Sequence, residues 1–333
     1  MQPTAIRLPA RFTRVLISVN PTAGSGSGQR RVECLAELLA AGGYRVDVVT
    51  DLDEMAQRAE RYFSEGTLRA VVAAGGDGTV AEVVNRTGAD VPLAVLPLGT
   101  ENLLAKYLCQ RPSAEAVFET IDQGISVKLD AACANGRIFL LMVGVGFDAE
   151  VVRRVEEARS GHITHAAYVK PIWDSIRSYQ YPELRVYCDR AASDDLEQAQ
   201  PSIAARWLFA FNLPRYGGGI PFAPQAVGTD GLLDVCTFRR GSFWQGLRYL
   251  ACIVCRQHER LADCVTAQTP RFRVEADVPV PYQIDGDLGG WLPLAVEVLP
   301  GRLSAVVPRR WLAKQGYRIE NESEAGGELG VRS

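Results

Sequence analysis

Residues 74–85 of the chain read AGGDGTVAEVVN, a stretch in which three glycines, a carboxylate and a hydroxyl crowd together. Glycine lets a ligand approach the backbone closely, and free amides at the start of a helix favour phosphate. Asp77 lies among those amides, where a carboxylate suits a phosphate-bound Mg²⁺ or a ribose hydroxyl. The stretch therefore predicts a phosphate site, and a capped turn without a ligand is the alternative.

The two commonest nucleotide motifs do not account for this turn. Residues 76–81 fit GxGxxA, but that fingerprint follows the first strand and expects an acidic residue at the end of the next strand. Here the next strand ends in Pro97, Leu98, Gly99 and Thr100, and no GxxxxGK[ST] occurs in the chain. A nucleotide is therefore expected to bind through another arrangement.

Two further turns and one threonine are expected at the same edge of a sheet. Residues 20–28 (NPTAGSGSG) follow the first predicted strand, residues 97–102 (PLGTEN) follow the fourth, and Thr50 ends the second. Ligands of open α/β sheets bind at the carboxyl ends of the strands. Three such turns on one rim are typical of a phosphate cradle.

The elements that must position these turns alternate between strand and helix patterns. In the first 125 residues we expect strands at 14–20, 44–50, 69–74 and 93–97, with helices at 29–41 and 52–64. That alternation predicts a parallel sheet covered by helices on both faces. Beyond residue 125 strands become more frequent, which predicts a largely antiparallel second domain. Its strands are expected at 127–133, 138–145, 184–188, 207–211, 233–238, 272–276 and 295–299, and its helices at 165–179 and 242–257.

Composition limits the class of protein. The 333 residues suggest about two domains, and 47% hydrophobic with 23% charged residues is ordinary globular composition. A net charge of −3 argues against a nucleic-acid binder. No apolar run reaches the roughly 18–20 residues of a membrane span, and the first residues lack the pattern of a secretory signal. Eight cysteines in such a chain are expected to be reduced thiols of a cytoplasmic protein.

In this order and spacing, NPTAGSGSG, AGGDGTVAEVVN and PLGTENLLA resemble the catalytic domain of the diacylglycerol kinases. Bacterial lipid kinases and the sphingosine and ceramide kinases share that domain. The resemblance extends over residues 15–308, through later blocks of the family. These blocks are VGVGFDAEVV (143–152), FNLPRYGGG (211–219), FAPQAVGTDGLLDV (222–235) and QIDGD (283–287).

The resemblance and the element pattern together imply the fold class. We expect an N-terminal three-layer α/β nucleotide-binding domain at residues 14–125, similar to NAD kinases and diacylglycerol kinases. A mostly antiparallel β-sandwich domain is expected at 126–308, with the end of the chain packing back on the first domain. Residues 1–13 are expected to form an N-terminal arm, and residues 316–333 a disordered tail.

The resemblance also implies roles for individual residues. ATP contacts fall on Asn20, Thr50, Gly75, Gly76, Asp77, Gly78, Thr79 and Thr100. A Mg²⁺ site falls on the Asp230 carboxylate, with Val227 and Leu232 contributing carbonyl oxygens, which suit a hard cation. The acid/base motif DGE is DGD here, at residues 285–287. Asp287 stands at the glutamate position with a side chain shorter by about 1.5 Å, so Asp285 and Asp287 both remain candidates for the base.

The function implied is an ATP- and Mg²⁺-dependent lipid kinase that phosphorylates a hydroxyl of diacylglycerol or of a sphingoid-type lipid, in phospholipid metabolism. The acceptor is expected to enter between the two domains. An NAD kinase-like enzyme and a non-catalytic nucleotide or lipid sensor are the alternatives. Expected partners are ATP, the lipid and a membrane surface contacted peripherally from the cytoplasm; no nucleic acid is expected, and a homodimer stays open. The apolar residues 243–255 are expected to cover the second sheet, or else to dock on a membrane.

Overall fold

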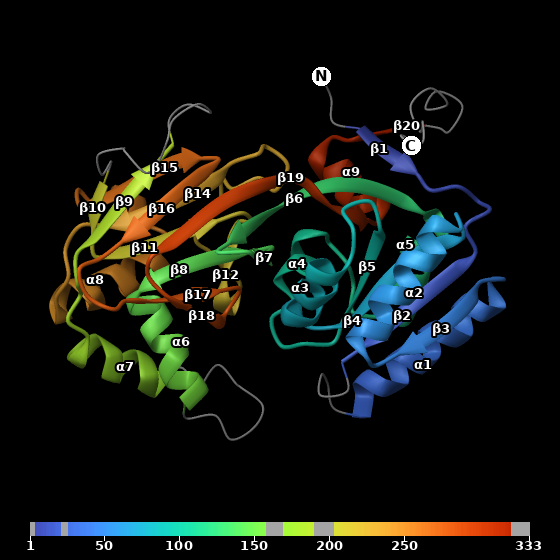
Figure 1. Ribbon diagram of the computed structural model, residues 1–333, viewed down its shortest axis with the longest axis horizontal. Helices are drawn as coiled ribbons and strands as arrows, with labels where there is room; N and C mark the ends of the chain where they lie inside the picture. Colours follow the sequence, from blue (N-terminus) through green and yellow to red (C-terminus); the bar gives the residue numbers. More distant parts are fainter. Residues whose placement is uncertain (1–3, 21–25, 158–168, 190–202, 321–333) are drawn as a thin grey trace. The chain divides into compact units, whose positions relative to one another are not determined.

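The computed structural model describes residues 4–20, 26–157, 169–189 and 203–320 (Figure 1). The chain divides into unit 1, residues 1–129 and 301–333, and unit 2, residues 130–300. Two strands, β6 (Ile125–Ala134) and β19 (Leu294–Val306), have residues in both units. Within the described ranges, no helix is long and apolar enough to cross a membrane.

Unit 1 is built on a parallel sheet in the order β19-β5-β4-β2-β3. Every residue of β4 is buried, which is typical of a parallel strand covered on both faces. The last part of β19 joins this sheet through Ser304 and Ala305, which pair with β5. The remaining strands of this sheet are β2 (Arg14–Val19), β3 (Arg45–Val49), β4 (Leu68–Gly75) and β5 (Pro92–Pro97).

Helices cover both faces of this sheet, as predicted (Figure 1). Successive strand residues point to opposite faces, and Val15, Ile17 and Val72 pack with the apolar sides of α1 and α5. The other face is covered by α2 and α3, which contact each other and strands β2 and β4. The helices of unit 1 are α1 (Gly26–Ala41), α2 (Leu52–Ser64), α3 (Asp77–Arg86), α4 (Leu103–Tyr107), α5 (Ala114–Gln123) and α9 (Arg309–Gln315).

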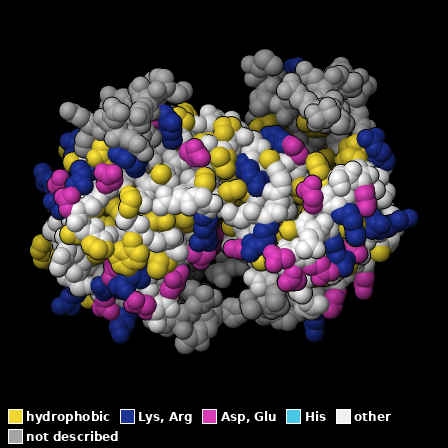
Figure 2. All heavy atoms as spheres, in the orientation of Figure 1, with side chains coloured by type: hydrophobic (Ala, Val, Ile, Leu, Met, Phe, Trp, Pro, Cys, Tyr) yellow, Lys and Arg dark blue, Asp and Glu magenta, His cyan; other side chains and the backbone are white. Residues whose placement is uncertain are grey.

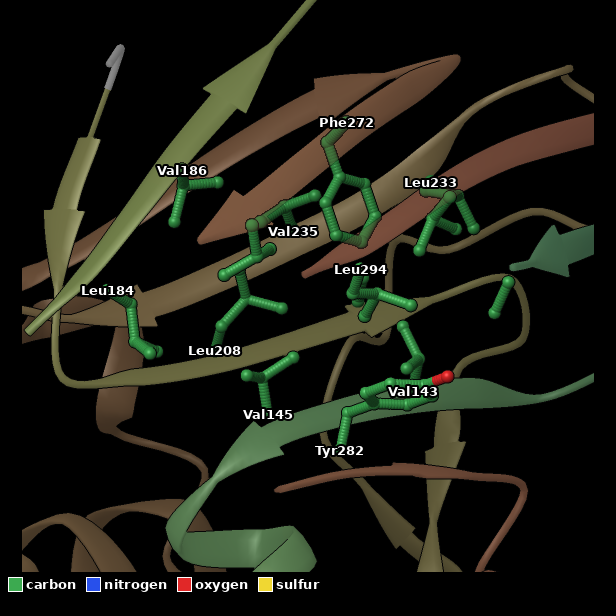
Figure 3. Packing of buried hydrophobic residues seen from close by; sticks show 14 of the residues in the cluster. Val143, Val145, Leu184, Val186, Leu208, Leu233, Val235, Phe272, Tyr282 and Leu294 are labelled. Carbon is green, nitrogen blue, oxygen red and sulfur yellow. The ribbon is translucent and has the colours of Figure 1, made fainter. Parts of the chain in front are cut away.

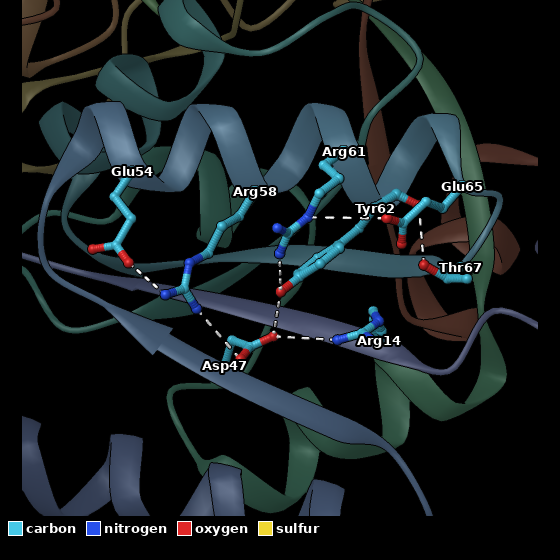
Figure 4. Close-up of polar contacts among 8 residues, drawn as sticks. All are labelled: Arg14, Asp47, Glu54, Arg58, Arg61, Tyr62, Glu65 and Thr67. Carbon is cyan, nitrogen blue, oxygen red and sulfur yellow. Dashed lines mark hydrogen bonds and ion pairs between the residues drawn. The ribbon is translucent and has the colours of Figure 1, made fainter.

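A polar cluster fastens α2 to the edge of the sheet (Figure 4). Asp47 of β3 accepts a hydrogen bond from the Tyr62 hydroxyl at 2.9 Å and forms ion pairs with Arg58 at 3.4 Å and Arg14 at 3.8 Å. The Arg14 guanidinium also lies 4.6 Å from the centroid of the Tyr62 ring. The Asp47 carboxylate therefore joins strands β2 and β3 to helix α2.

The ends of the chain contain regular structure where an arm and a tail were expected. Strand β1 (Thr4–Arg7) pairs in parallel with β20 (Arg318–Glu320) and antiparallel with the start of β6. Residues 318–320 were expected to belong to a disordered tail, and backbone pairing orders them instead. Residues 1–3 and 321–333 lie outside the described part of the chain.

Unit 2 is a sandwich of two antiparallel sheets. One has the order β15-β14-β11-β8-β17-β18, and the other contains β10-β9-β16 and the first part of β19. The strands of the first sheet are β8 (Met142–Gly146), β11 (Trp207–Phe211), β14 (Leu233–Phe238), β15 (Cys264–Thr269), β17 (Pro281–Ile284) and β18 (Asp287–Trp291). The other strands of unit 2 are β7 (Arg137–Phe139), β9 (Leu184–Cys188), β10 (Ile203–Ala205), β12 (Arg215–Tyr216), β13 (Ile220–Pro221) and β16 (Arg271–Glu275).

The core of unit 2 lies between the two sheets (Figure 3). Val143, Val145 and Leu208 of one sheet face Val186 and Phe272 of the other, and all five are buried. The inward-facing residues of the predicted strands lie in this core. The predicted fold class, an α/β domain with a parallel sheet and an antiparallel sandwich, is therefore the one observed.

In the described part of unit 2, three α-helices lie outside the sandwich strands: α6 (Phe147–Glu157), α7 (Val169–Ser178) and α8 (Phe243–Val254). The strand expected at 138–145 is wrong as a single element, because the chain forms β7 and then a separate strand β8. Helix α6 and the β17–β18 hairpin were not anticipated, and the hairpin holds the DGD sequence. Short 3₁₀ turns occur at Gly217–Gly219 and His258–Arg260.

Candidate active site

The predicted phosphate turns of unit 1 lie against each other. Gly75 at the end of β4 pairs with Pro97 at the end of β5, so both turns leave the same edge of the sheet. A Cβ on Gly99 would lie 2.6 Å from the Gly76 Cα, and one on Gly75 would lie 2.1 Å from the Thr79 Oγ1. Glycine is needed here because the two turns touch through their backbones.

The Asp77 carboxylate links the two turns. Its Oδ2 accepts a hydrogen bond from the Leu103 amide at 2.9 Å, and its Oδ1 accepts one from the Leu104 amide at 3.0 Å. These amides begin helix α4, so Asp77 satisfies donors that the helix leaves without an internal partner. Burial raises the pKa of Asp77, and the two amides partly oppose that rise. Each oxygen thus binds the start of α4, directly after the PLGTEN turn. Contact of Asp77 with Mg²⁺ or a ribose hydroxyl stays a prediction.

The turn that Asp77 holds is also fixed from within. Asn102 has a φ of 49°, in the left-handed region that asparagine tolerates better than most residues. Its Oδ1 accepts a hydrogen bond from the Gly99 amide at 3.0 Å, and its Nδ2 donates to the Gly99 carbonyl at 2.6 Å. Thr100 is exposed within this turn.

Four of the predicted ATP contacts line one pocket of unit 1, with a volume of about 160 Å³. They are Asn20, Thr50, Gly78 and Thr79, accompanied by Leu52 and Glu82. The Asn20 side-chain amide donates to the Thr79 hydroxyl at 3.3 Å, which fixes both groups at the pocket wall. The other four predicted ATP contacts, Gly75, Gly76, Asp77 and Thr100, do not line this pocket. Most of the NPTAGSGSG turn, at 21–25, lies outside the described residues.

In unit 2 the two aspartates of the DGD sequence have different surroundings. Asp285 has a φ of 51°, and its carboxylate accepts hydrogen bonds from the amides of three consecutive residues at 2.8–2.9 Å. Asp287 is 58% exposed at its side chain and pairs with Arg137 at 3.1 Å. Asp285 therefore anchors the hairpin to the start of β8, while Asp287 presents a carboxylate to solvent. The three amides belong to Leu140, Leu141 and Met142.

A series of buried hydrogen bonds supports the same hairpin from the interior of unit 2. Gln283 accepts from the Gly286 amide at 2.8 Å and donates to Asp148 Oδ2 at 2.7 Å. Asp148 also accepts a hydrogen bond from the Tyr216 hydroxyl. Burial raises the pKa of Asp148, and these two donors partly offset the rise. Tyr216, Asp148 and Gln283 thus connect the PRYGGG segment to the middle residue of DGD.

The predicted Mg²⁺ residues lie in one loop of unit 2. The Asp230 Oδ1 accepts from the Leu232 amide at 3.0 Å, and the Val227 carbonyl accepts from the amides of Thr229 and Asp230. Burial raises the pKa of Asp230, and the nearby charge of Asp130 raises it further. Asp130 itself accepts from the Gly231 amide at 2.8 Å. Among the described residues, no group of three or more His, Cys, Asp or Glu side chains is arranged to hold a metal ion.

Comparison with known sequences assigns both units. The diacylglycerol kinase catalytic domain matches residues 14–134, and the YegS C-terminal NAD kinase beta sandwich-like domain matches residues 141–307. The chain belongs to the diacylglycerol kinase family.

Relatives match this kinase over most of its length. A diacylglycerol kinase of Mycobacterium tuberculosis is 28% identical over 311 residues, covering 89% of this chain and 96% of the relative. A diacylglycerol kinase of Bacillus subtilis is 24% identical over 304 residues, covering 89% and 97%. A crystal structure of a putative diacylglycerol kinase from Bacillus anthracis shares the fold, with a TM-score of 0.69, 22% identity and coverage of 91% and 99%. The kinase is therefore a phosphotransferase with an alcohol group as acceptor.

Several residues of this site escaped the sequence analysis. Asp130 approaches Asp230 from strand β6, one hundred residues away in the chain. Asp148 and Tyr216 lie in blocks that the sequence analysis singled out, but nothing in either block indicated that they pair. Arg137 was not identified from the sequence, because a lone arginine at the start of a strand belongs to no motif.

Replacing Asp77 with alanine tests its structural assignment. Asp77→Ala leaves two α4 amides without their acceptor, so we expect unit 1 to lose about 1–2 kcal/mol of stability and ATP binding to weaken. Ser113→Ala is the matched control, since Ser113 caps α5 through the Ala116 amide at 3.3 Å. Thermal unfolding and ATP titration measure the two effects. If both variants lose the same stability and also bind ATP with the same affinity, the assignment of Asp77 as the residue that holds the predicted phosphate turns is contradicted.

Tyr216→Phe tests the buried chain beneath the DGD hairpin. Removing the hydroxyl raises the pKa of Asp148 further. We expect a loss of stability of about 1–3 kcal/mol at pH values where the Asp148 carboxyl is ionised. A carboxyl group whose pKa is raised by folding destabilises the folded state least when it is protonated. The loss of stability caused by Tyr216→Phe should therefore be complete at pH values above the pKa that Asp148 has in the folded protein. It should decrease as the pH falls through that pKa.

Denaturant unfolding of Tyr216→Phe at several pH values makes that measurement. Tyr187→Phe is the control, because the Tyr187 hydroxyl donates to the partly exposed Glu275 at 3.2 Å in the same unit. A stability loss that is independent of pH would show that the Asp148 carboxylate is not what the Tyr216 hydroxyl stabilises.

Proposed function

We propose that this chain transfers the γ-phosphoryl group of ATP to the hydroxyl of a diacylglycerol, with Mg²⁺. The observation that carries the proposal is the pair of touching glycine turns beside the Asn20–Thr79 pocket, in a chain of this family. The relatives named diacylglycerol kinase support that acceptor, and a sphingoid-type lipid is the second candidate.

In this proposal unit 1 holds the nucleotide. Phosphoryl transfer depends mainly on positioning and on neutralising charge, and the turns offer backbone amides beside the pocket. Asn20, Thr50 and Thr79 supply polar side-chain groups there, and Gly78 leaves room for the phosphates. Gly75, Gly76 and Asp77 set the shape of the turn, and we assign Thr100 to the nucleotide from the exposed side of the PLGTEN turn.

We propose that Asp287 is the general base that takes the proton from the acceptor hydroxyl. A general base must come within about 3 Å of the proton it takes, or act through one water, and Asp287 is the exposed carboxylate of the DGD hairpin. Asp285 is the positioning residue, since its oxygens already accept three backbone hydrogen bonds. Arg137 keeps the Asp287 carboxylate oriented by ion pairing.

A Mg²⁺ ion is proposed at the loop that carries Asp230. Its donors are oxygens, which a hard cation prefers, and a cation would relieve the repulsion between the Asp130 and Asp230 carboxylates. Asp230 and the carbonyls of Val227 and Leu232 would hold the ion, joined by Asp130. Bound there, Mg²⁺ would supply charge neutralisation and rigidity to the loop.

The cellular setting follows from the acceptor. A diacylglycerol resides in a membrane and ATP in the cytoplasm, so we propose a cytoplasmic protein that contacts membranes peripherally. Its product would enter phospholipid biosynthesis. A homodimer stays a prediction that sedimentation velocity can test.

The function is tested with γ-labelled ATP, Mg²⁺ and a panel of acceptors, followed by chromatography of the products. We expect label in phosphatidic acid when diacylglycerol is supplied. Label in NADP instead would identify an NAD kinase. ATP binding without label in any product would identify a sensor and overturn the proposal.

Asp287→Asn tests the base. We expect kcat to fall about 10²- to 10⁴-fold while KM for ATP stays unchanged, because the nucleotide contacts belong to other residues. Asp277→Asn, at an exposed ion pair with Arg185 in the same unit, is the control and should keep full activity. An active Asp287→Asn beside an inactive, normally stable Asp285→Asn would transfer the role to Asp285.

Asp230→Asn tests the Mg²⁺ site with a readout besides activity. An ion that binds the folded state raises the unfolding temperature according to its affinity. We expect the Mg²⁺ concentration for half-maximal thermal protection to rise at least tenfold in Asp230→Asn and to stay unchanged in Asp277→Asn. Identical Mg²⁺ titrations of wild type and Asp230→Asn would place the ion elsewhere.

A further inference from the structure

Helix α8 of unit 2 is apolar on two opposite sides. Gly246, Tyr249 and Ile253 are buried against the body of the unit. On the other side, Trp244, Leu247, Ala251 and Val254 follow one another at helical spacing and are exposed. We call these four residues the α8 stripe. Its large side chains are exposed by 74% at Trp244, 41% at Leu247 and 65% at Val254, whereas ordinary surface helices turn a polar side to solvent.

The neighbouring helix α7 extends this apolar surface. Trp173 of α7 is exposed and packs edge-to-face on Phe243 of α8, with ring centroids 5.9 Å apart. Phe243 in turn contacts the Trp244 ring at 5.0 Å. Figure 2 shows hydrophobic side chains gathered on the end of unit 2 that carries these helices. Exposed aromatic and aliphatic side chains that adjoin in this way mark a contact surface rather than isolated surface residues.

The charged side chains within residues 239–258 are all arginines; Glu259 follows directly, and Arg240 forms an ion pair with Asp263 at 3.9 Å. Residues 239–258 contain four arginines and no Asp or Glu, in a chain whose net charge is −3. All four arginines are exposed: Arg239, Arg240, Arg248 and Arg256. Arg177 of α7 adds a guanidinium 5.9 Å from the Trp173 ring centroid. An apolar stripe bordered by arginines complements a surface that is apolar below and anionic at its rim.

We propose that the α8 stripe docks this kinase on membranes that contain anionic lipid. A 12-residue helix is about 18 Å long, and such a helix can lie in the interface with its apolar side among the acyl chains. Trp244 at the start of the helix supplies the aromatic anchor. Arg248 can extend its guanidinium to the phosphates while its stem stays in apolar surroundings. The proposal rests on the lipid kinase function proposed above, and names the surface by which the enzyme reaches its acceptor.

Vesicle binding by the full-length chain tests whether the α8 stripe docks on membranes. The probe is cosedimentation with vesicles of phosphatidylcholine alone, or of phosphatidylcholine with phosphatidylglycerol. We expect wild type to bind the anionic vesicles strongly and the neutral vesicles weakly. Trp244→Ala should weaken binding about tenfold, since it removes a large side chain from the acyl region. Arg248→Gln should weaken binding to anionic vesicles about fivefold and leave binding to neutral vesicles unchanged.

Two exposed residues outside the stripe are matched controls. Trp291 is 50% exposed on β18, and Arg45 is exposed on β3 of unit 1. Trp291→Ala and Arg45→Gln should bind both kinds of vesicle as wild type does. Equal binding by Trp244→Ala and Trp291→Ala would overturn the proposal.

A soluble acceptor separates failure of the surface from failure of the function. With a short-chain diacylglycerol dissolved as a monomer, Trp244→Ala should keep the wild-type kcat/KM. If wild type transfers no label to this acceptor, the lipid kinase function fails whatever the vesicles show. If it transfers label but Trp244→Ala binds vesicles normally, only the docking surface fails. Sedimentation of wild type as a dimer and of Trp244→Ala as a monomer would assign the stripe to an interface between copies and also overturn the proposal.

Discussion

The backbone contact between two glycine turns is the constraint on which unit 1 depends. Gly76 and Gly99 approach so closely that a side chain on either would collide with the other turn or strain against it. Asp77 secures this contact, because each carboxylate oxygen accepts an amide from the start of α4. A carboxylate that the sequence assigned to a ligand thus holds together the backbone of the predicted phosphate turns. The polar groups of Asn20 and Thr79 can then keep fixed places at the pocket wall.

In unit 2, a series of buried, hydrogen-bonded polar side chains likewise fixes the backbone of a turn. Tyr216, Asp148 and Gln283 come from three separate segments and meet beneath one hairpin. A buried carboxylate is costly unless donors satisfy it, and here the donors are a hydroxyl and an amide whose other end binds the Gly286 backbone. These hydrogen bonds offset the free-energy cost of burying Asp148. The result is a rigid support for the hairpin that carries the exposed carboxylate of Asp287. Both units therefore place buried polar groups behind the surfaces that carry the predicted site residues.

Regular alternation and turn chemistry made much of the fold predictable. The strand expected at 184–188 and the helix expected at 52–64 have the predicted bounds, because their apolar spacing and flanking residues agree. The β17–β18 hairpin was missed because its strands are short and β18 contains two glycines, so the residues lack a clear period of two. Strand β20 was missed because its pairing with β1 joins opposite ends of the chain, which local pattern does not encode.

The sequence by itself determined the family and the two kinds of architecture, and it located the segments predicted to carry the chemistry, since glycine turns and carboxylates are local features with a fixed order. Only the tertiary structure decided what each carboxylate does. Asp77, Asp285 and Asp287 look alike in a sequence, yet two accept backbone amides and one faces solvent. Their partners, such as Leu103, Leu140 or Arg137, lie from 26 to 150 residues away. Hydrogen bonding depends on distance in space, and folding alone sets that distance.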